Sequence, residues 1–308
     1  MTPRRIVLTG GRGFVGSTVA HRLAAAGHDL VIPSRSPHNA GPLGALPNVA
    51  VVAADIHDDA ELDRLFADAD AVINFVGVLH SKSGDPWGPD FNRAHVTLPR
   101  RIVAACQRQN VARLLHISAL GAGSDAPSQY QRSKAAGENE IRAAGDSPAW
   151  TMLRPSVIFG PGDSFLNLFD TLTRYFPVLP LAGAHARFQP VYVEDVAEVM
   201  VRCLDTPATA GQIFELGGPR QYTLKELVET VCRLTGRKRL VVPLPESLGM
   251  AQAALLECLP QPPMSRDNLR SMRVDNITHG APLPFGLEPH ALEDIAPGYL
   301  GAKQGGRD

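Results

Sequence analysis

The sequence predicts an α/β protein with a doubly wound parallel sheet and a smaller C-terminal lobe. Over the first 160 residues, short runs rich in Val, Ile and Leu alternate with amphipathic stretches of helical length. Near-continuous apolar strands of this kind are typical of a parallel sheet covered by helices on both faces. A glycine-rich turn joins the first strand to the first helix, and the C-terminal third is apolar and rich in proline.

The predicted elements follow one another in regular order. Strands are expected within 4–10, 28–35, 49–56, 70–77, 112–121 and 149–160, and helices over 14–26, 58–67, 91–109 and 128–144. In a sheet of this type, ligands bind beyond the carboxyl ends of the strands. We therefore expect the functional residues in the segments that follow the strands. The tail from residue 301 onward is expected to be disordered.

Composition narrows the class of protein. The chain has 308 residues, 44% of them apolar, and a net charge of −1. It has no basic field for nucleic acid and no apolar run of the roughly 18 residues that span a bilayer. A strand begins near Ile6, which leaves no room for a signal peptide. We expect a cytoplasmic monomer or homodimer with reduced, buried cysteines and no metal site, the cysteines being Cys106, Cys203, Cys232 and Cys258.

The turn in "VLTGGRGFVGSTVAHRL" carries three glycines between the first strand and the first helix. Glycines there allow a sharp turn, a close approach to a pyrophosphate and tight packing of the helix on the strand. The helix N-terminus offers its N–H groups and positive dipole end to phosphates. We predict a dinucleotide site here, the alternative being a purely structural turn. The predicted contacts are Gly10, Arg12, Gly13, Phe14, Val15 and Gly16.

The end of the second strand bears on the choice between NADP and NAD. An acidic residue there would bond the ribose 2′-hydroxyl of NAD, but the sequence has Ser34, Arg35 and Ser36. An arginine suits the 2′-phosphate of NADP, because its planar fork can hold a phosphate through two hydrogen bonds. Arg12 could reach the same phosphate. We expect NADP rather than NAD, the alternative being that both arginines are solvated surface residues.

The third strand ends in "AADIHD". Asp55 is placed to contact the adenine and Ile56 to pack on it. Asp55 could instead cap the helix that follows.

Several motifs together resemble the short-chain dehydrogenase/reductase superfamily in its extended or atypical branch. They are T-G-G-x-G-F-V-G in the first turn, "NFVG" at 74–77, Ser118 after the fifth strand, Tyr130 with Lys134, and "LRPSVIFGPGD" at 153–163. The stretches at 188–200 and 214–228 match the extended branch. "HISALGAGSDAPSQYQRSKAAGE" and "PPMSRDNLRSMRVDN" are similar to the group of the nucleotide-binding accessory subunit of respiratory complex I and its bacterial relatives.

The resemblance implies a Rossmann fold with a separate substrate lobe. Residues 1–160 with 188–217 would form the NADP-binding domain, and 161–187 with 218–308 the smaller lobe. It also implies cofactor contacts from the segments after the fourth and sixth strands. These contacts are Val76, Gly77, Pro155 and Val157.

The resemblance further implies a catalytic set of Ser118, Tyr130 and Lys134. Tyr130 and Lys134 lie four residues apart in "SQYQRSKAAGE", so both would face the same side of a helix. A free tyrosine has a pKa of about 10, and a nearby ammonium would favour its phenolate. In the family the serine holds the substrate oxygen, the tyrosine transfers a proton, and the lysine also bonds the nicotinamide ribose. Tyr130 and Lys134 are therefore cofactor contacts as well.

Two further polar residues have competing interpretations. Asn92 resembles the asparagine of the superfamily's fourth helix, but we expect it to cap that helix. Asp195 is likewise expected to cap a helix rather than to contact substrate.

The predicted lobe is apolar, and its arginines Arg174, Arg187 and Arg220 are scattered. Such a lobe disfavours a nucleotide-sugar substrate. Apolar residues at helical spacing over 246–259 predict a helix that packs in the core, since the basic flank of a membrane-surface helix is missing.

The leading hypothesis is an NADP-dependent oxidoreductase that acts on a small apolar carbonyl, alcohol or quinone-like compound. The main alternative is a non-catalytic NADPH-binding structural or assembly protein of a respiratory complex. A peripheral position at the inner face of the membrane is the alternative to a free cytoplasmic one. Weaker alternatives are a nucleotide-sugar epimerase or dehydratase and an NADPH redox sensor. The substrate itself stays unknown.

Overall fold

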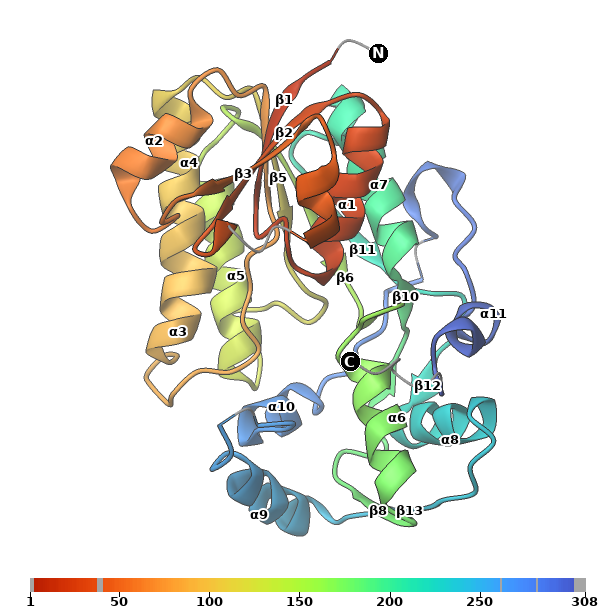
Figure 1. Ribbon diagram of the computed structural model, residues 1–308. Coiled ribbons are helices and arrows are strands. Elements are labelled where there is room, and N and C mark those ends of the chain that lie inside the picture. Colours follow the sequence, from red (N-terminus) through yellow and green to blue (C-terminus); the bar gives the residue numbers. More distant parts are fainter. Residues whose placement is uncertain (1–2, 38–40, 261, 281, 302–308) are drawn as a thin grey trace.

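Seven parallel strands form the central sheet of the computed structural model, which describes residues 3–37, 41–260, 262–280 and 282–301 (Figure 1). The strands are β1 (Arg5–Thr9), β2 (Asp29–Ser34), β3 (Val49–Ala53), β4 (Ala71–Asn74), β5 (Arg113–Ile117), β6 (Ala149–Pro155) and β11 (Gln212–Leu216). Their order is β11-β6-β5-β4-β1-β2-β3. The order reverses between β1 and β4, where such a sheet has its ligand crevice. The predicted doubly wound parallel sheet is confirmed.

Helices cover both faces of this sheet (Figure 1). One face carries α1 (Phe14–Ala25) and α7 (Val193–Asp205), and the other carries α2 (Asp59–Phe66), α4 (Leu98–Arg108) and α5 (Gln129–Arg142). A short helix α3 (Pro89–Phe91) and a π-helical turn η3 (Asn92–Thr97) lead directly into α4. Each face is sealed by its own apolar cluster, which explains why the strands are apolar on both sides.

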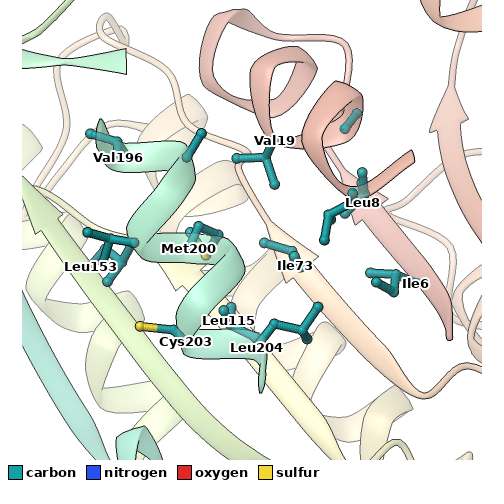
Figure 2. Close-up of a cluster of buried hydrophobic side chains, with 14 of the residues drawn as sticks. Ile6, Leu8, Val19, Ile73, Leu115, Leu153, Val196, Met200, Cys203 and Leu204 are labelled. Carbon is teal, nitrogen blue, oxygen red and sulfur yellow. The ribbon is translucent and has the colours of Figure 1, made fainter. Parts of the chain in front are cut away.

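Figure 2 shows the cluster between the sheet and the helices α1 and α7. Met200 of α7 lies near Ile73 and Leu115 of the sheet, Val19 of α1 lies above Ile73 in this view, and Val196 lies further along α7, above Leu153. These side chains are fully buried. After leaving the sheet at β6, the chain thus returns to it through α7 and β11.

A second group of elements packs below the carboxyl edge of the sheet (Figure 1). Its helices are α6 (Phe165–Tyr175), α8 (Leu224–Leu234), α9 (Glu246–Leu256), α10 (Arg266–Ser271) and α11 (Leu292–Ile295). Its strand pairs are β7 (Ile158–Phe159) with β10 (Val191–Tyr192), β9 (Arg187–Phe188) with β12 (Tyr222–Thr223), and β8 (Val178–Leu181) with β13 (Leu240–Pro243). Short 3₁₀ turns lie at Gly41–Ala45, Pro207–Thr209, Pro284–Gly286 and Ala296–Gly298. A third apolar cluster joins α6, α8 and α11.

Side-chain caps set the start of several helices. Asp58 accepts the N–H of Glu61 at α2, Ser128 accepts that of Gln131 at α5, and Thr223 forms a reciprocal capping box at α8. Helix α1 differs, because its N-cap is Gly13 and no side chain caps it.

The structure corrects two expectations about the second lobe. Helix α9 does not pack as a core helix: Gly249 and Ala253 are buried, but Leu248 and Leu255 are 57% and 73% exposed. Cys258 is exposed, whereas the other three cysteines are buried. Among the described residues, no helix is both long and apolar enough to cross a membrane. The predicted disordered tail at 302–308 lies outside the described residues.

Candidate functional site

The glycine loop lies at the switch point of the sheet, in contact with the segment after β4. Gly10 has a φ of +75°, and a Cβ there would lie 3.1 Å from the N atom of Val76. A Cβ on Gly16 would lie 2.5 Å from the carbonyl oxygen of Gly10. These two positions therefore require glycine.

The loop leaves the N-terminus of α1 without a side-chain cap and without an acidic residue in its first turn. The open amide end beside a close-packed glycine turn fits a pyrophosphate, which would accept the first-turn N–H groups. Phe14, Val15 and Gly16 provide that first turn. The residues predicted for the phosphate end thus lie together.

The residues predicted for the 2′-phosphate also meet, with one exception. A guanidinium nitrogen of Arg12 donates to the Ser34 hydroxyl at 2.6 Å and to the Ser36 carbonyl at 2.9 Å. The backbone N–H of Ser36 also donates to the Ser34 hydroxyl, at 3.2 Å. The side chain of Arg35 is exposed, and its contact with the 2′-phosphate stays a prediction. The fork of Arg12 is therefore the cation that the structure holds at the end of β2.

The end of β3 shows that Asp55 does not cap α2, and its contact with the adenine stays a prediction. Asp58 caps α2, while the Asp55 carboxylate accepts the N–H of His57 at 2.9 Å. Asp55 thus shapes the turn after β3 and is exposed. Ile56 is partly buried against the core cluster of that face.

A buried polar chain positions the segment after β4, which carries Val76 and Gly77. The Asn74 amide oxygen accepts from the Thr9 hydroxyl at 2.9 Å and from the N–H of Val76 at 3.1 Å. Its amide nitrogen lies 3.0 Å from Nδ1 of His116. Burial holds the pKa of His116 well below its usual range, so this ring is neutral. The ends of β1, β4 and β5 are thereby fixed to one another.

Tyr130 lies against two aromatic rings. Its ring centroid is 6.0 Å from that of Phe91 and 5.5 Å from that of His95, both edge-to-face. Burial lowers the pKa of His95 to about 2. Nε2 of His95 accepts the N–H of Val78 at 3.0 Å, so Nδ1 carries the proton and donates to the Ser133 hydroxyl at 2.8 Å. The π-helical turn holds His95 in this place, where it ties the β4 segment to α5.

Lys134 and Tyr130 do not act on each other as expected. The Lys134 ammonium is buried and donates to the Ile117 carbonyl at 2.8 Å. Burial lowers the pKa of Lys134 to about 8, against the opposing effect of Glu138. Burial alone raises the pKa of Tyr130 to about 12, without the lowering that a nearby ammonium would cause. The phenol therefore keeps its proton near neutral pH.

Ser118 lies on Glu138, one helical turn beyond Lys134. Its hydroxyl donates to the Glu138 carboxylate at 2.6 Å. Glu138 is fully buried, and its carboxylate also accepts hydrogen bonds from two guanidinium nitrogens of Arg154, at 2.7 and 2.6 Å, and from one of Arg142 at 2.9 Å. Ser118 thus belongs to a buried ionic network, and the structure does not direct its hydroxyl to Tyr130.

The N-terminus of α5 is held by an aspartate of the second lobe (Figure 1). The two carboxylate oxygens of Asp267, in α10, accept the backbone N–H groups of Gln129 and Tyr130 at 2.8 and 2.9 Å. A carboxylate at this end also matches the helix dipole. Asp267 therefore fixes the backbone of Tyr130 itself.

The end of β6 is joined to the lobe in a similar way. The side-chain oxygen of Asn276 accepts from the Ser156 hydroxyl at 2.7 Å and from the N–H of Val157 at 3.0 Å. Pro155 is buried directly before this contact. Pro155 and Val157, both predicted cofactor contacts, thus lie in a segment that the lobe holds through the backbone N–H of Val157.

Asn92 and Asp195 do not cap helices. Asn92 lies inside the helical stretch that begins after Gly88, and its side-chain oxygen accepts from the Trp87 indole at 3.2 Å. Asp195 follows the N-cap Tyr192, and its carboxylate accepts the N–H of His290 at 2.9 Å. Neither interpretation as a cap was correct.

Sequence reasoning missed Glu138, His95, Asp267 and Asn276. Glu138 could have been found by extending the Tyr130/Lys134 spacing by one more helical turn. The two lobe residues carry no local signal, because their partners lie more than a hundred positions away in the chain.

Comparisons with known proteins identify relatives of the chain. The sequence model of the NAD dependent epimerase/dehydratase family matches residues 6–217. The chain is 30% identical to the mitochondrial NADH dehydrogenase [ubiquinone] 1 alpha subcomplex subunit 9 of Arabidopsis thaliana, over 94% of this chain and 76% of that protein. It is 31% identical to the ceramide reductase of Caulobacter vibrioides, over 82% and 77%. Its fold matches the X-ray structure of Pal from Bacillus thuringiensis with a TM-score of 0.75 at 16% identity, covering 96% and 97%.

Replacing Glu138 by Gln should strongly destabilise the protein. The change leaves the charge of Arg154 without its buried partner, and breaking such a pair costs about 3–5 kcal/mol. Urea unfolding followed by circular dichroism measures the loss. Glu140→Gln on the same helix is the matched control: its exposed pair with Arg100 should contribute less than about 1 kcal/mol. Equal effects of the two changes would contradict the ionic network.

Replacing Asp267 by Ala should lower stability by about 1 kcal/mol, because two amides at the start of α5 lose their acceptor. Amide hydrogen exchange should accelerate in the first turn of α5 and not at its C-terminus. Asp275→Ala, an exposed aspartate of the same segment, serves as the control. Unchanged exchange at Gln129 and Tyr130 would refute the clamp.

Proposed function

This chain belongs to the NAD-dependent epimerase/dehydratase family of extended short-chain dehydrogenases/reductases, and we propose that it is an NADP-dependent reductase of an apolar carbonyl compound. The observation that carries this proposal is Tyr130. Its phenol keeps its proton, with a pKa of about 12, on the helix that begins at the carboxyl edge of the sheet. A protonated phenol is suited to donate a proton to a developing alkoxide, which is the direction of carbonyl reduction.

Tyr130 and Lys134 have different roles in this reaction. NADPH, when bound, supplies the hydride that the carbonyl carbon receives. Tyr130 gives its proton to the carbonyl oxygen, so that the product is an alcohol. Lys134, with a pKa of about 8, is mostly protonated at neutral pH, and its ammonium favours negative charge at this edge. The aromatic contacts with Phe91 and His95 hold the Tyr130 ring in place.

NADP is favoured over NAD by the arrangement at the end of β2. The guanidinium of Arg12, the hydroxyl of Ser34 and the backbone of Ser36 meet there, and none of residues 34–36 is acidic. A phosphate dianion would find a cation and hydrogen-bond donors in this position.

An apolar substrate is favoured by the second lobe. Arg174, Arg187 and Arg220 contact Asp170, Gln221 and Glu293, respectively, so they are not gathered to hold a diphosphate. The likeness to a ceramide reductase over most of the chain supports the same class of substrate.

A second candidate function is a nucleotide-binding structural subunit without turnover. The commitment of the Ser118 hydroxyl to Glu138 favours it, because this leaves the expected substrate contact engaged in the fold. The likeness to a mitochondrial NADH dehydrogenase subunit supports it too. This candidate predicts tightly held NADPH in the purified protein and no oxidation of NADPH by apolar ketones or quinones.

Replacing Tyr130 by Phe should lower the rate of NADPH oxidation on an active ketone by about 10²–10⁴-fold and change NADPH affinity far less than the rate. The wild-type rate should show no loss from Tyr130 ionisation near neutral pH. It should decline above about pH 8, where Lys134 loses its charge. Stopped-flow fluorescence measures both quantities, with the exposed Tyr175→Phe as control. Undiminished turnover in the Tyr130 variant would refute the proton transfer.

Replacing Arg12 by Gln should weaken NADPH binding roughly 10-fold or more, since one charge-assisted contact is lost, and should spare NADH. Titration calorimetry with both nucleotides measures the difference. Arg108→Gln, in an exposed ion pair on α4, is the control. An equal loss of affinity for NADH would contradict this role, because Arg12 would then contact a group that NADPH and NADH share rather than the 2′-phosphate.

A further inference from the structure

The second lobe exposes an apolar surface at its end farthest from the central sheet (Figure 1). One part is the outward face of the β8–β13 pair, where exposed residues alternate with buried ones. The other part is a stripe on and just after α9. The apolar end patch, as we call it, consists of Val178, Leu240, Val242, Leu248, Leu255 and Leu259.

The two parts of the apolar end patch adjoin. The Gln252 side chain of α9 donates to the Pro180 carbonyl of β8 at 3.2 Å. Gly249 lies so close to Ala182 that a Cβ on it would be 2.8 Å from the Ala182 side chain. Gly249 and Ala253 are the buried residues of α9, whereas Leu248 and Leu255 point outward. A helix that is apolar on every side is normally covered.

One edge of the patch is aromatic and basic. Tyr175 and Phe176 are 71% and 54% exposed immediately before β8. Lys238 and Arg239 precede Leu240 of β13. Lys238 is exposed, and Arg239 is half-buried with its Nε donating to the Thr173 carbonyl of α6. Neither cation is paired with a carboxylate among the residues that the structure describes. Since the N–H of Leu240 bonds the carbonyl of Pro177, these cations lie next to the aromatic pair.

The acidic residues at the ends of α9 do not offset this charge. Glu246 pairs with Arg273 at 2.5 Å, and Glu257 pairs with Arg266 at 2.9 Å. The surface therefore combines aliphatic area, an aromatic edge and uncompensated positive charge. These are the features that bind proteins to an anionic bilayer surface.

We propose that the apolar end patch docks onto the surface of a bilayer that contains anionic phospholipid. The leucines of α9 and the aromatic pair would enter the interface, and Lys238 and Arg239 would meet the headgroups. A second copy of the chain fits less well, because Glu246 and Glu257 at the ends of α9 are already paired and would not offer a carboxylate to Lys238 and Arg239 of the other copy. The proposal does not depend on which reaction the protein catalyses.

Flotation of the full chain with vesicles tests the proposal. We expect binding to phosphatidylcholine vesicles that contain phosphatidylglycerol and none to pure phosphatidylcholine, with release as salt increases. The double variant Leu248→Gln/Leu255→Gln should lose vesicle affinity by a factor of about 10 or more. Lys238→Glu should reduce binding by a similar factor.

The control is Phe285→Asn, which removes an exposed apolar side chain near α7. Asn tolerates the backbone there, where φ is +65°. Full binding by this control and a far-ultraviolet spectrum unchanged in every variant would support the proposal. Absence of flotation, equal binding to neutral vesicles, or full binding by the double variant would overturn it. So would a concentration-dependent dimer that the double variant abolishes, since the patch would then join two copies.

Discussion

The arrangement of the site depends on one buried charge, the carboxylate of Glu138. A carboxylate without any exposed surface must be paired and hydrogen-bonded to remain ionised. It draws Arg154 from β6, Arg142 from its own helix and Ser118 from the turn after β5. These bonds fix the rotation of helix α5 against two strands. As a result, Lys134 is turned inward, and Tyr130 lies on the rings of Phe91 and His95.

The C-terminal segment couples the two halves of the molecule at the same edge. Asp267 holds the first turn of α5, and Asn276 holds the turn after β6. Both bonds are made to backbone amides of the nucleotide-binding half. The lobe that is expected to receive the substrate therefore also positions residues that are predicted to face the cofactor.

Features that depend on neighbouring residues in the sequence were predicted well. Contacts between side chains that are distant in the sequence were not. Strand periodicity gave the sheet, and the glycine spacing located the open end of α1, because both are local properties of the backbone. Helical spacing places Glu138 on the same face of α5 as Lys134, but it does not show that this carboxylate bonds Ser118. That contact depends on how a helix that begins eleven residues later packs on the sheet. The exposure of α9 was missed for a related reason. Its apolar spacing looks the same whether the leucines or the small residues face the lobe, and the basic edge comes from a neighbouring strand.

The aspartate clamp on α5 has a consequence for exchanging parts between relatives. The family model matches residues 6–217 and does not extend over the C-terminal part of the lobe, which makes that part an obvious unit to graft when a new specificity is sought. Here the graft would also carry away the acceptor for two amides at the start of the tyrosine helix. A chimera built on this chain would have to supply a carboxylate at the same point in space, or redesign the helix start so that it caps itself.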